Sequence, residues 1–316
     1  MRNEPILKLR FSLTAAFLAI AAIGLAASPA PKSASGAKAF ETPQQAADAL
    51  VAAAEKQDPD ALLAIFGPGG KDLVNSGDPV EDKNHLEAFT KKAREKMSVE
   101  ADPNNPKRML VLVGSDGWPL PVPIVKSGGK WRFDASQGRE EILARRIGGN
   151  ELDAIDILRG YVEAQEEYAQ KLHDGSKVHQ YAQKAISSPG KHDGLSWKNA
   201  DGSVGGPLGD LIAKALEEGY TKKGEPYNGY YFRTLTAQGP SARLGARNYV
   251  VNGMMIGGFA AIAWPANYGV TGIQTFLVNS DGVVYQKDLG PETAKLAAEI
   301  KTYNPDKTWV ITEDEQ

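Results

Sequence analysis

Three consecutive stretches decide the fold of the second half of this chain: PYNGYYFRTLTAQG (residues 226–239), ARNYVVNGMMIGGFAAIAWPANYG (246–269) and VTGIQTFLVNSDGVVYQKDLG (270–290). Short apolar runs alternate in them with Asn, Asp and Gly. Residues 249–251 and 254–256 flank Asn252-Gly253, and a similar pair of runs flanks residues 280–282. Asn, Asp and Gly tolerate the positive φ that tight hairpin turns require. The stretches therefore predict an antiparallel sheet as the core of the second half.

Composition indicates a soluble globular protein and excludes several classes of partner. The 316 residues are 42% hydrophobic and 24% charged, and the formal net charge is −3. This length accommodates two domains of ordinary size. The charge balance gives no sign of the basic face or stripe that nucleic-acid-binding proteins carry. No nucleic acid is therefore expected as a partner. The chain has no Cys, which excludes disulfides and thiol chemistry.

Residues 1–30 have the three parts of a secretory signal peptide. Arg2, Lys8 and Arg10 precede an apolar run at 11–27, and small residues follow it. We expect cleavage rather than a retained anchor, because the run is short for a membrane span and no stop-transfer pattern follows it. The mature protein is therefore expected to be periplasmic or secreted, without a stable membrane span.

The sequence of the first half predicts helices followed by strands. Thr42-Pro43 and Asp58-Pro59 each begin a predicted helix, and a third helix is predicted from about Lys83 to Met97. Short β-type runs follow at 109–113, 119–125 and 130–133. This order predicts a small helix-plus-antiparallel-sheet domain over 38–146. It resembles the cone-shaped domains typified by nuclear transport factor 2, and that resemblance implies a pocket for a small ligand.

A long helix introduces the second half. The basic pair Arg145-Arg146 and the pair Gly148-Gly149 predict an interruption, after which Asn150 caps a helix over about 151–172. A short helix at 207–218, the sheet, a helix at 291–301 and a final strand at 308–311 follow. The predicted class is α+β, with a second domain over 147–316 in which the long helix packs on the antiparallel sheet.

Four segments of the sequence resemble those of a known protein family. PGKHDGLSW (189–197), PYNGYYFR (226–233), YVVNGMMIGGF (249–259) and DGVVYQKDLG (281–290) closely resemble a bacterial family of exported proteins, domain-of-unknown-function family 2950. The resemblance covers nearly all of the chain after the signal peptide. It implies export and leaves the activity open.

The second half also resembles the globular head of type IV pilin-like proteins. The resemblance rests on the predicted helix sequence NELDAIDILRGYVEAQEEYA (150–169) and on the sheet after it, which closes on an Asp-Gly-Val hairpin. No long apolar helix is fused ahead of the head, and residues 10–15 lack the Gly and Glu of a prepilin cleavage site. The resemblance is therefore to the head alone.

Catalytic and metal-binding motifs are absent from the sequence. Three of the four histidines lie in one loop-rich segment, but they are separated by 5 and 12 residues, without the paired spacing of zinc sites. His173-Asp174-Gly175 and His192-Asp193-Gly194 are explained as turns. No Gly-x-Ser-x-Gly elbow or phosphate-binding loop occurs. The sequence predicts no catalytic residue, no metal and no cofactor.

Two groups of side chains remain as candidate binding residues. One is the loop set His192, Asp193 and Trp197. The other is the aromatic set Tyr227, Tyr230, Tyr231 and Arg233, in which strand alternation places Tyr231 and Arg233 opposite Tyr230. Exposed Tyr and Arg are typical anchors of interfaces. We therefore expect an exported, non-enzymatic protein that binds a partner in the cell envelope. The alternative is a small-ligand-binding protein or enzyme that uses a pocket in the cone-like domain.

Overall fold

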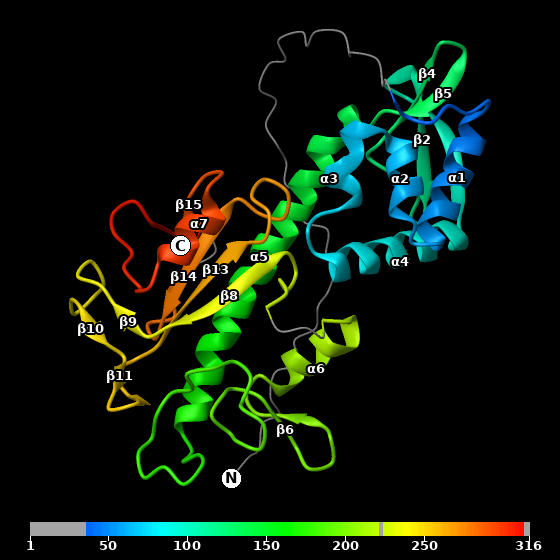
Figure 1. Ribbon diagram of the computed structural model, residues 1–316. Coiled ribbons are helices and arrows are strands. Elements are labelled where there is room, and N and C mark those ends of the chain that lie inside the picture. Colours follow the sequence, from blue (N-terminus) through cyan, green and yellow to red (C-terminus); the bar gives the residue numbers. More distant parts are fainter. Residues whose placement is uncertain (1–35, 221–223, 313–316) are drawn as a thin grey trace. The chain divides into compact units, whose positions relative to one another are not determined.

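The computed structural model describes residues 36–220 and 224–312 of the chain (Figure 1). The predicted signal peptide lies outside the described residues. Helices and antiparallel sheets occur in separate runs along the chain, so the predicted α+β class is confirmed. Over the described ranges, no helix is both long enough and apolar enough to cross a membrane.

The first half begins with helices that are capped as their sequences predict. Helix α1 (Pro43–Glu55) starts at Thr42, whose hydroxyl accepts the Gln45 N–H at 3.1 Å. Helix α2 (Pro59–Phe66) starts at Asp58, whose carboxylate accepts the Ala61 N–H at 3.0 Å. The short helices η1 (Pro68–Gly70) and α3 (Lys71–Val74) lead to α4 (Pro79–Glu95). The predicted start of α4 at Lys83 is wrong, because the helix begins at Pro79, four residues earlier, with Asp78 as its cap.

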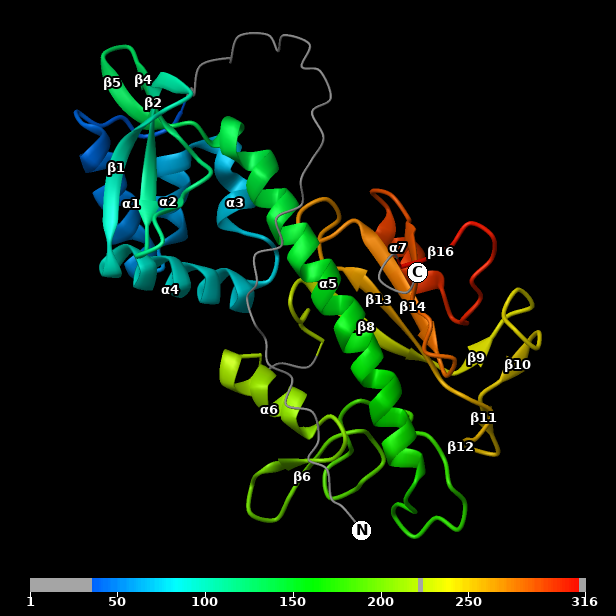
Figure 2. The same ribbon diagram turned by 180° about the vertical axis from the view of Figure 1, so that it is seen from behind.

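A five-stranded antiparallel sheet completes the first half. Its strand order is β1-β2-β4-β5, with β3 also paired to β2. The prediction missed β1 altogether and gave Met97 to the preceding helix. Helices α1, α2 and α4 pack on this sheet, as Figure 2 shows from behind. The strands are β1 (Met97–Asp102), β2 (Asn105–Val113), β3 (Trp118–Pro119), β4 (Ile124–Ser127) and β5 (Lys130–Phe133).

Helix α5 (Ala135–Ala169) is one continuous helix of 35 residues. The predicted interruption at Gly148-Gly149 is therefore wrong, as is the predicted helix start at 151. Tertiary contacts on both sides of the glycines hold the backbone helical. Arg146 donates to the Asp72 carbonyl at 2.8 Å, and Asn150 donates to the Thr271 carbonyl at 3.1 Å. Such contacts outweigh the cost of about 1 kcal/mol that glycine imposes inside a helix.

The second half contains a five-stranded antiparallel sheet with the order β16-β15-β14-β13-β8. Helix α5 packs against β13 and β14, and helix α7 (Thr293–Glu299) packs against β13. The strands are β8 (Tyr230–Leu235), β13 (Ala260–Pro265), β14 (Gln274–Asn279), β15 (Tyr285–Asp288) and β16 (Val310–Ile311). The predicted hairpin of β14 and β15 is confirmed.

Smaller elements surround this sheet. The Asn252-Gly253 hairpin is confirmed, with positive φ at both residues, but its strands form a separate two-stranded ribbon. The prediction that these two strands belong to the core sheet is therefore wrong. The smaller elements are β6 (Trp197–Lys198), β7 (Val204–Gly205), α6 (Gly209–Glu218), β9 (Ala237–Gln238), β10 (Arg247–Asn248), β11 (Val250–Val251) and β12 (Met254–Met255).

The described residues form two hydrophobic cores. One is drawn from residues that precede the middle of α5 in the sequence, and the other from residues that follow it. Leu50, Ile65 and Phe133 belong to the first core, which is drawn from residues 40–133. Leu158 and Phe276 belong to the second core, which is drawn from residues 154–303. The division into domains 38–146 and 147–316 stays a prediction, and its boundary falls within α5.

Candidate functional site

The candidate site is a cluster of aromatic and histidine side chains at the C-terminal end of α5. The Tyr168 ring, on the last turns of α5, stacks on the His173 ring with centroids 3.8 Å apart and planes 10° apart. The Trp197 ring on β6 lies 6.0 Å from His173 and 4.4 Å from His192. The structure thus brings the predicted residues His192 and Trp197 together with Tyr168 and His173. We call these four residues the aromatic cluster.

Hydrogen bonds fix the loops that carry the aromatic cluster. The Asp174 carboxylate accepts the His192 N–H at 3.0 and 2.9 Å. The Tyr168 hydroxyl donates to the His192 carbonyl at 2.5 Å. Because the N–H and the carbonyl of His192 are both hydrogen-bonded, this loop has little conformational entropy to lose when it binds a partner.

Asp193, which the sequence analysis gave as a candidate binding residue, stabilises these loops through hydrogen bonds. Its carboxylate accepts the Lys184 ammonium at 2.7 Å and the Ser188 N–H at 2.7 Å. These bonds, the one from Lys184 first, lower the pKa of Asp193 to about 2. The side chain is therefore ionised at neutral pH and anchors the turn that presents His192.

A cavity of about 610 Å³ opens beside the aromatic cluster. Tyr168 and His173 form part of its wall, and charges of both signs come from Asp174, Asp193 and Lys191. Its remaining lining residues are Gly175, Ser176 and Gln180. The volume falls within the range of about 300 to 1,000 Å³ that is typical of small-molecule sites. Aromatic rings with nearby charges also suit the anchor positions of a protein interface.

The side chains of the predicted aromatic set lie in different surroundings, although three of the four residues share β8. Tyr230 is fully buried in the second core, and its hydroxyl donates to the Gln274 carbonyl at 2.9 Å. Tyr231 and Arg233 lie against Trp264, with the Arg233 guanidinium 5.2 Å from that ring. The predicted alternation of Tyr230 and Tyr231 is confirmed, and a binding role for either stays a prediction.

Arg233 and Tyr227 each contribute to packing. Arg233 donates to the Ala297 and Ile300 carbonyls at 2.7 and 2.6 Å, which caps the C-terminal end of α7. The Tyr227 ring packs edge-on against Tyr220 at 4.8 Å. Among the described residues, no ring contact joins the aromatic set to the aromatic cluster.

A buried carboxylate group that the sequence analysis missed lies at the start of α4. Asp78 is 1% exposed and Glu81 is 6% exposed. Neither Glu81 carboxylate oxygen has a hydrogen-bond partner among the described residues. Burial, followed by the charge of Asp78, raises the pKa of Glu81 to about 7. The pair Asp78-Pro79 repeats the helix-start signal of Asp58-Pro59 and is the sequence feature that could have located this group.

The carboxylate group does not constitute a metal site. In the part of the chain that the structure describes, no three His, Asp or Glu side chains are arranged to hold a metal ion. Strongly perturbed buried carboxyl groups are common at functional sites, and they also occur in structural networks. Here Asp78 is fully engaged in hydrogen bonds, so the immediate role of the group is structural.

Comparison with known proteins gives the family of the chain. A family model described as a protein of unknown function, DUF2950, matches residues 37–311. The chain belongs to the DUF2950 family. No curated protein and no solved structure matches it. The match covers both sheets and the whole of α5, so a single family model spans the first and second halves of this DUF2950 chain.

Proposed function

We propose that this chain is an exported, non-enzymatic protein that binds a partner in the cell envelope through the aromatic cluster. The observation that carries the proposal is the convergence of Tyr168, His173, His192 and Trp197 beside one cavity. The rings of His173, His192 and Trp197 are at least partly exposed, Trp197 lies on β6, and hydrogen bonds already fix the loop at His192. Such rings make strong anchors, because little entropy is lost when they bind.

Export is supported by the three-part signal pattern in residues 1–30. The resemblance of the second half to pilin-like heads supports a partner in the envelope. A direct test of export is the intact mass of material recovered outside the cytoplasm. We expect a mature chain that begins between about residue 28 and residue 38. Recovery of the chain with residues 11–27 retained in membranes would contradict export as a free protein.

The binding surface is tested by photo-crosslinking in intact cells. A photoreactive amino acid replaces Lys191, which lines the cavity, and in a second strain it replaces Lys91, which is exposed on α4. We expect one reproducible protein adduct from position 191 and none at the same mass from position 91. Trp197→Ala should abolish that adduct, whereas Trp309→Ala, at a part-exposed tryptophan outside the cluster, should leave it. Identical adducts in both Trp variants would refute the proposed surface.

A further inference from the structure

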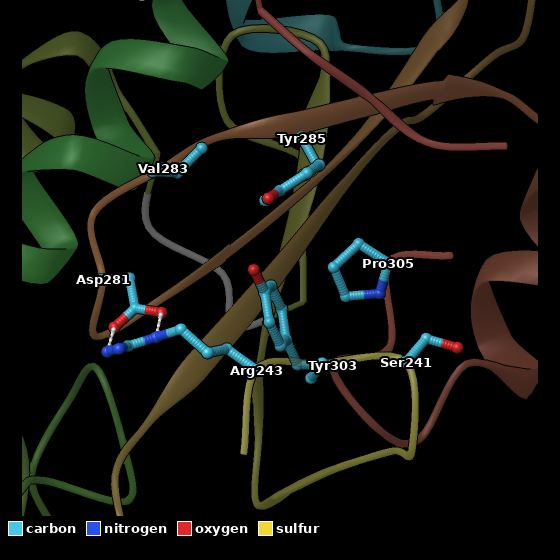
Figure 3. Close-up of a pocket in the computed structure, with 8 residues that line it drawn as sticks. Ser241, Arg243, Asp281, Val283, Tyr285, Tyr303 and Pro305 are labelled. Carbon is cyan, nitrogen blue, oxygen red and sulfur yellow. Dashed lines mark hydrogen bonds and ion pairs between the residues drawn. The ribbon is translucent and has the colours of Figure 1, made fainter. Parts of the chain in front are cut away.

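A second cavity, of about 500 Å³, lies between the loop after β9 and the segment after α7. Figure 3 shows Tyr303 between Arg243 and Pro305, with its hydroxyl directed toward Tyr285. The other lining residues are Ser241, Ala242, Asp281 and Val283. We call this cavity the tyrosine pocket.

Hydrogen bonds to backbone groups fix the segments that form the walls of the tyrosine pocket. The Tyr303 N–H donates to the Ala237 carbonyl at 2.9 Å, and the Tyr303 carbonyl accepts the Gly239 N–H at 2.9 Å. Gln238 donates to the Arg243 carbonyl at 2.6 Å, and Asn304 accepts the Ser241 N–H at 2.7 Å. The pocket is therefore formed before any ligand arrives, and that lowers the entropic cost of binding.

The charges of the pocket cancel within it. The Arg243 guanidinium donates two hydrogen bonds to the Asp281 carboxylate, at 3.2 and 3.0 Å (Figure 3). No other lining residue carries a formal charge. An anionic ligand would have to compete with Asp281 for Arg243, and a cationic ligand would have to compete with Arg243 for Asp281. The pocket therefore favours a neutral ligand.

The pocket nevertheless offers many hydrogen-bonding groups. Arg243 has five N–H donors and uses two of them on Asp281, and the carboxylate keeps lone pairs on both oxygens. Tyr285 and Tyr303 each add a hydroxyl that can donate or accept a hydrogen bond. The Arg243 side chain is 73% exposed and that of Asp281 is 36% exposed, so a ligand can reach both groups.

The ligand that fits this set of groups is neutral, carries many hydroxyls and has an apolar face for a tyrosine ring. Sugar rings have all three properties. The part-exposed Tyr285 ring supplies rigid, amphipathic contact area at low entropic cost, and the exposed Ser241 adds an adaptable polar contact. We propose that the tyrosine pocket binds a neutral saccharide. This site is independent of the aromatic cluster, so the failure of either proposal leaves the other unaffected.

The test measures saccharide binding to the full chain by nuclear magnetic resonance. The probes are maltotriose, cellotriose and chitotriose, which are neutral, with trigalacturonate and the glucosamine trimer as charged comparators. We expect at least one neutral trisaccharide to bind at concentrations up to about 10 mM and to shift the backbone signals of Ser241, Arg243 and Tyr303. Absence of neutral binding, preferential binding of a charged trimer or shifts confined to other residues would each overturn the proposal.

Matched variants sharpen the result. Tyr285→Ala should weaken binding of the neutral trisaccharide about tenfold or more, and Tyr268→Ala, a part-buried tyrosine outside the pocket, should not change it. Equal affinities for the two variants would overturn the assignment. Asp281→Asn frees Arg243, so this variant should bind trigalacturonate more tightly than the parent does. If any variant fails to fold, the signal shifts of the parent chain still decide the question.

Discussion

The Asp78 carboxylate accepts the backbone N–H of Gly229 at 3.1 Å, although the two residues lie 151 positions apart in the sequence. The same oxygen accepts the Tyr220 hydroxyl at 3.1 Å. The other oxygen caps α4 by accepting the N–H groups of Val80 and Glu81, both at 3.1 Å. One buried side chain thus begins a helix of the first half and fixes a turn of the second.

Asp78→Ala is therefore expected to destabilise the protein severely. The change removes a helix cap, worth about 1 kcal/mol, and leaves the Gly229 N–H and the Tyr220 hydroxyl without an acceptor, at about 1 to 3 kcal/mol for each group. We expect the free energy of unfolding to fall by about 3 to 7 kcal/mol in denaturant titrations.

Asp58→Ala is the matched control for this change. Asp58 also precedes a proline and caps a helix, but among the described residues its side chain accepts a hydrogen bond from the Ala61 N–H alone. Its replacement should cost about 1 kcal/mol. Equal losses at the two positions would show that the bonds from Asp78 to the second half contribute nothing to stability.

The buried Glu81 predicts how stability depends on pH. Its pKa is raised from an ordinary 4.5 to about 7, first by burial and then by the charge of Asp78. Asp82 also raises it, whereas Arg146 on α5 lowers it, and the exposed His85 lies 3.9 Å from the carboxylate. Between pH 4.5 and 7 the folded chain keeps a proton that the unfolded chain has released. Stability is therefore expected to fall as the pH rises through this window, by about 3 kcal/mol in total.

Glu81→Gln isolates this contribution. Glutamine keeps the shape and cannot ionise, so the variant should lose this fall in stability and should be more stable than the parent at pH 8. Glu87→Gln, on the same helix with a side chain that is 54% exposed, is the control and should follow the parent. Unfolding free energies at pH 5 and pH 8 measure the difference. Parallel pH profiles for the parent and Glu81→Gln would contradict a buried, protonated Glu81.

Local sequence signals predicted the elements that depend on local chemistry. Thr42-Pro43, Asp58-Pro59 and Asn252-Gly253 each specify a cap or a turn through residues that are adjacent in the chain, and the structure contains all three. The same chemistry at Asp78-Pro79 marks the true start of α4. The α+β class followed from the order of such elements along the chain.

Features that depend on distant partners were not predictable in this way. The continuity of α5 past Gly148-Gly149 rests on contacts of Arg146 and Asn150 with remote carbonyls. The grouping of Trp197 with His173 and Tyr168 rests on the path of a loop between them. The tyrosine pocket joins residues from separate segments, and no spacing in the sequence brings them together.

The continuity of α5 also predicts where trypsin cuts. On sequence alone, Arg145 and Arg146 mark an exposed boundary. In the structure they lie inside a hydrogen-bonded helix, whereas Lys184, Lys191 and Lys198 lie in or beside loops. Trypsin cuts exposed loops in preference to hydrogen-bonded helices, so brief digestion should cut at these lysines before either arginine. Mass spectrometry of the fragments reads out the order, and early cleavage after Arg145 or Arg146 would contradict a continuous helix in solution.

Gly253→Val is expected to destabilise the protein through backbone strain. Gly253 has φ +79° and follows Asn252 at φ +51°, so both turn residues adopt the left-handed conformation. A β-branched residue there costs on the order of 1 to 3 kcal/mol. The space around Gly253 is open, because a Cβ added at this residue would have no other atom within 4 Å. Any loss of stability would therefore report the backbone conformation and not a collision.

The control for this substitution has to be a glycine without either constraint. From the sequence, Gly70 in the Gly-Pro-Gly-Gly loop looks tolerant, but a Cβ at Gly70 would lie 2.3 Å from the Cβ of Phe66. Gly69 is the better control, because it is exposed, has no positive φ and has no atom within 4 Å of an added Cβ. Thermal unfolding of Gly253→Val should occur at a clearly lower midpoint than that of Gly69→Val, which should stay close to the parent. Coincident midpoints for the two variants would mean that the Asn252-Gly253 hairpin does not form in solution.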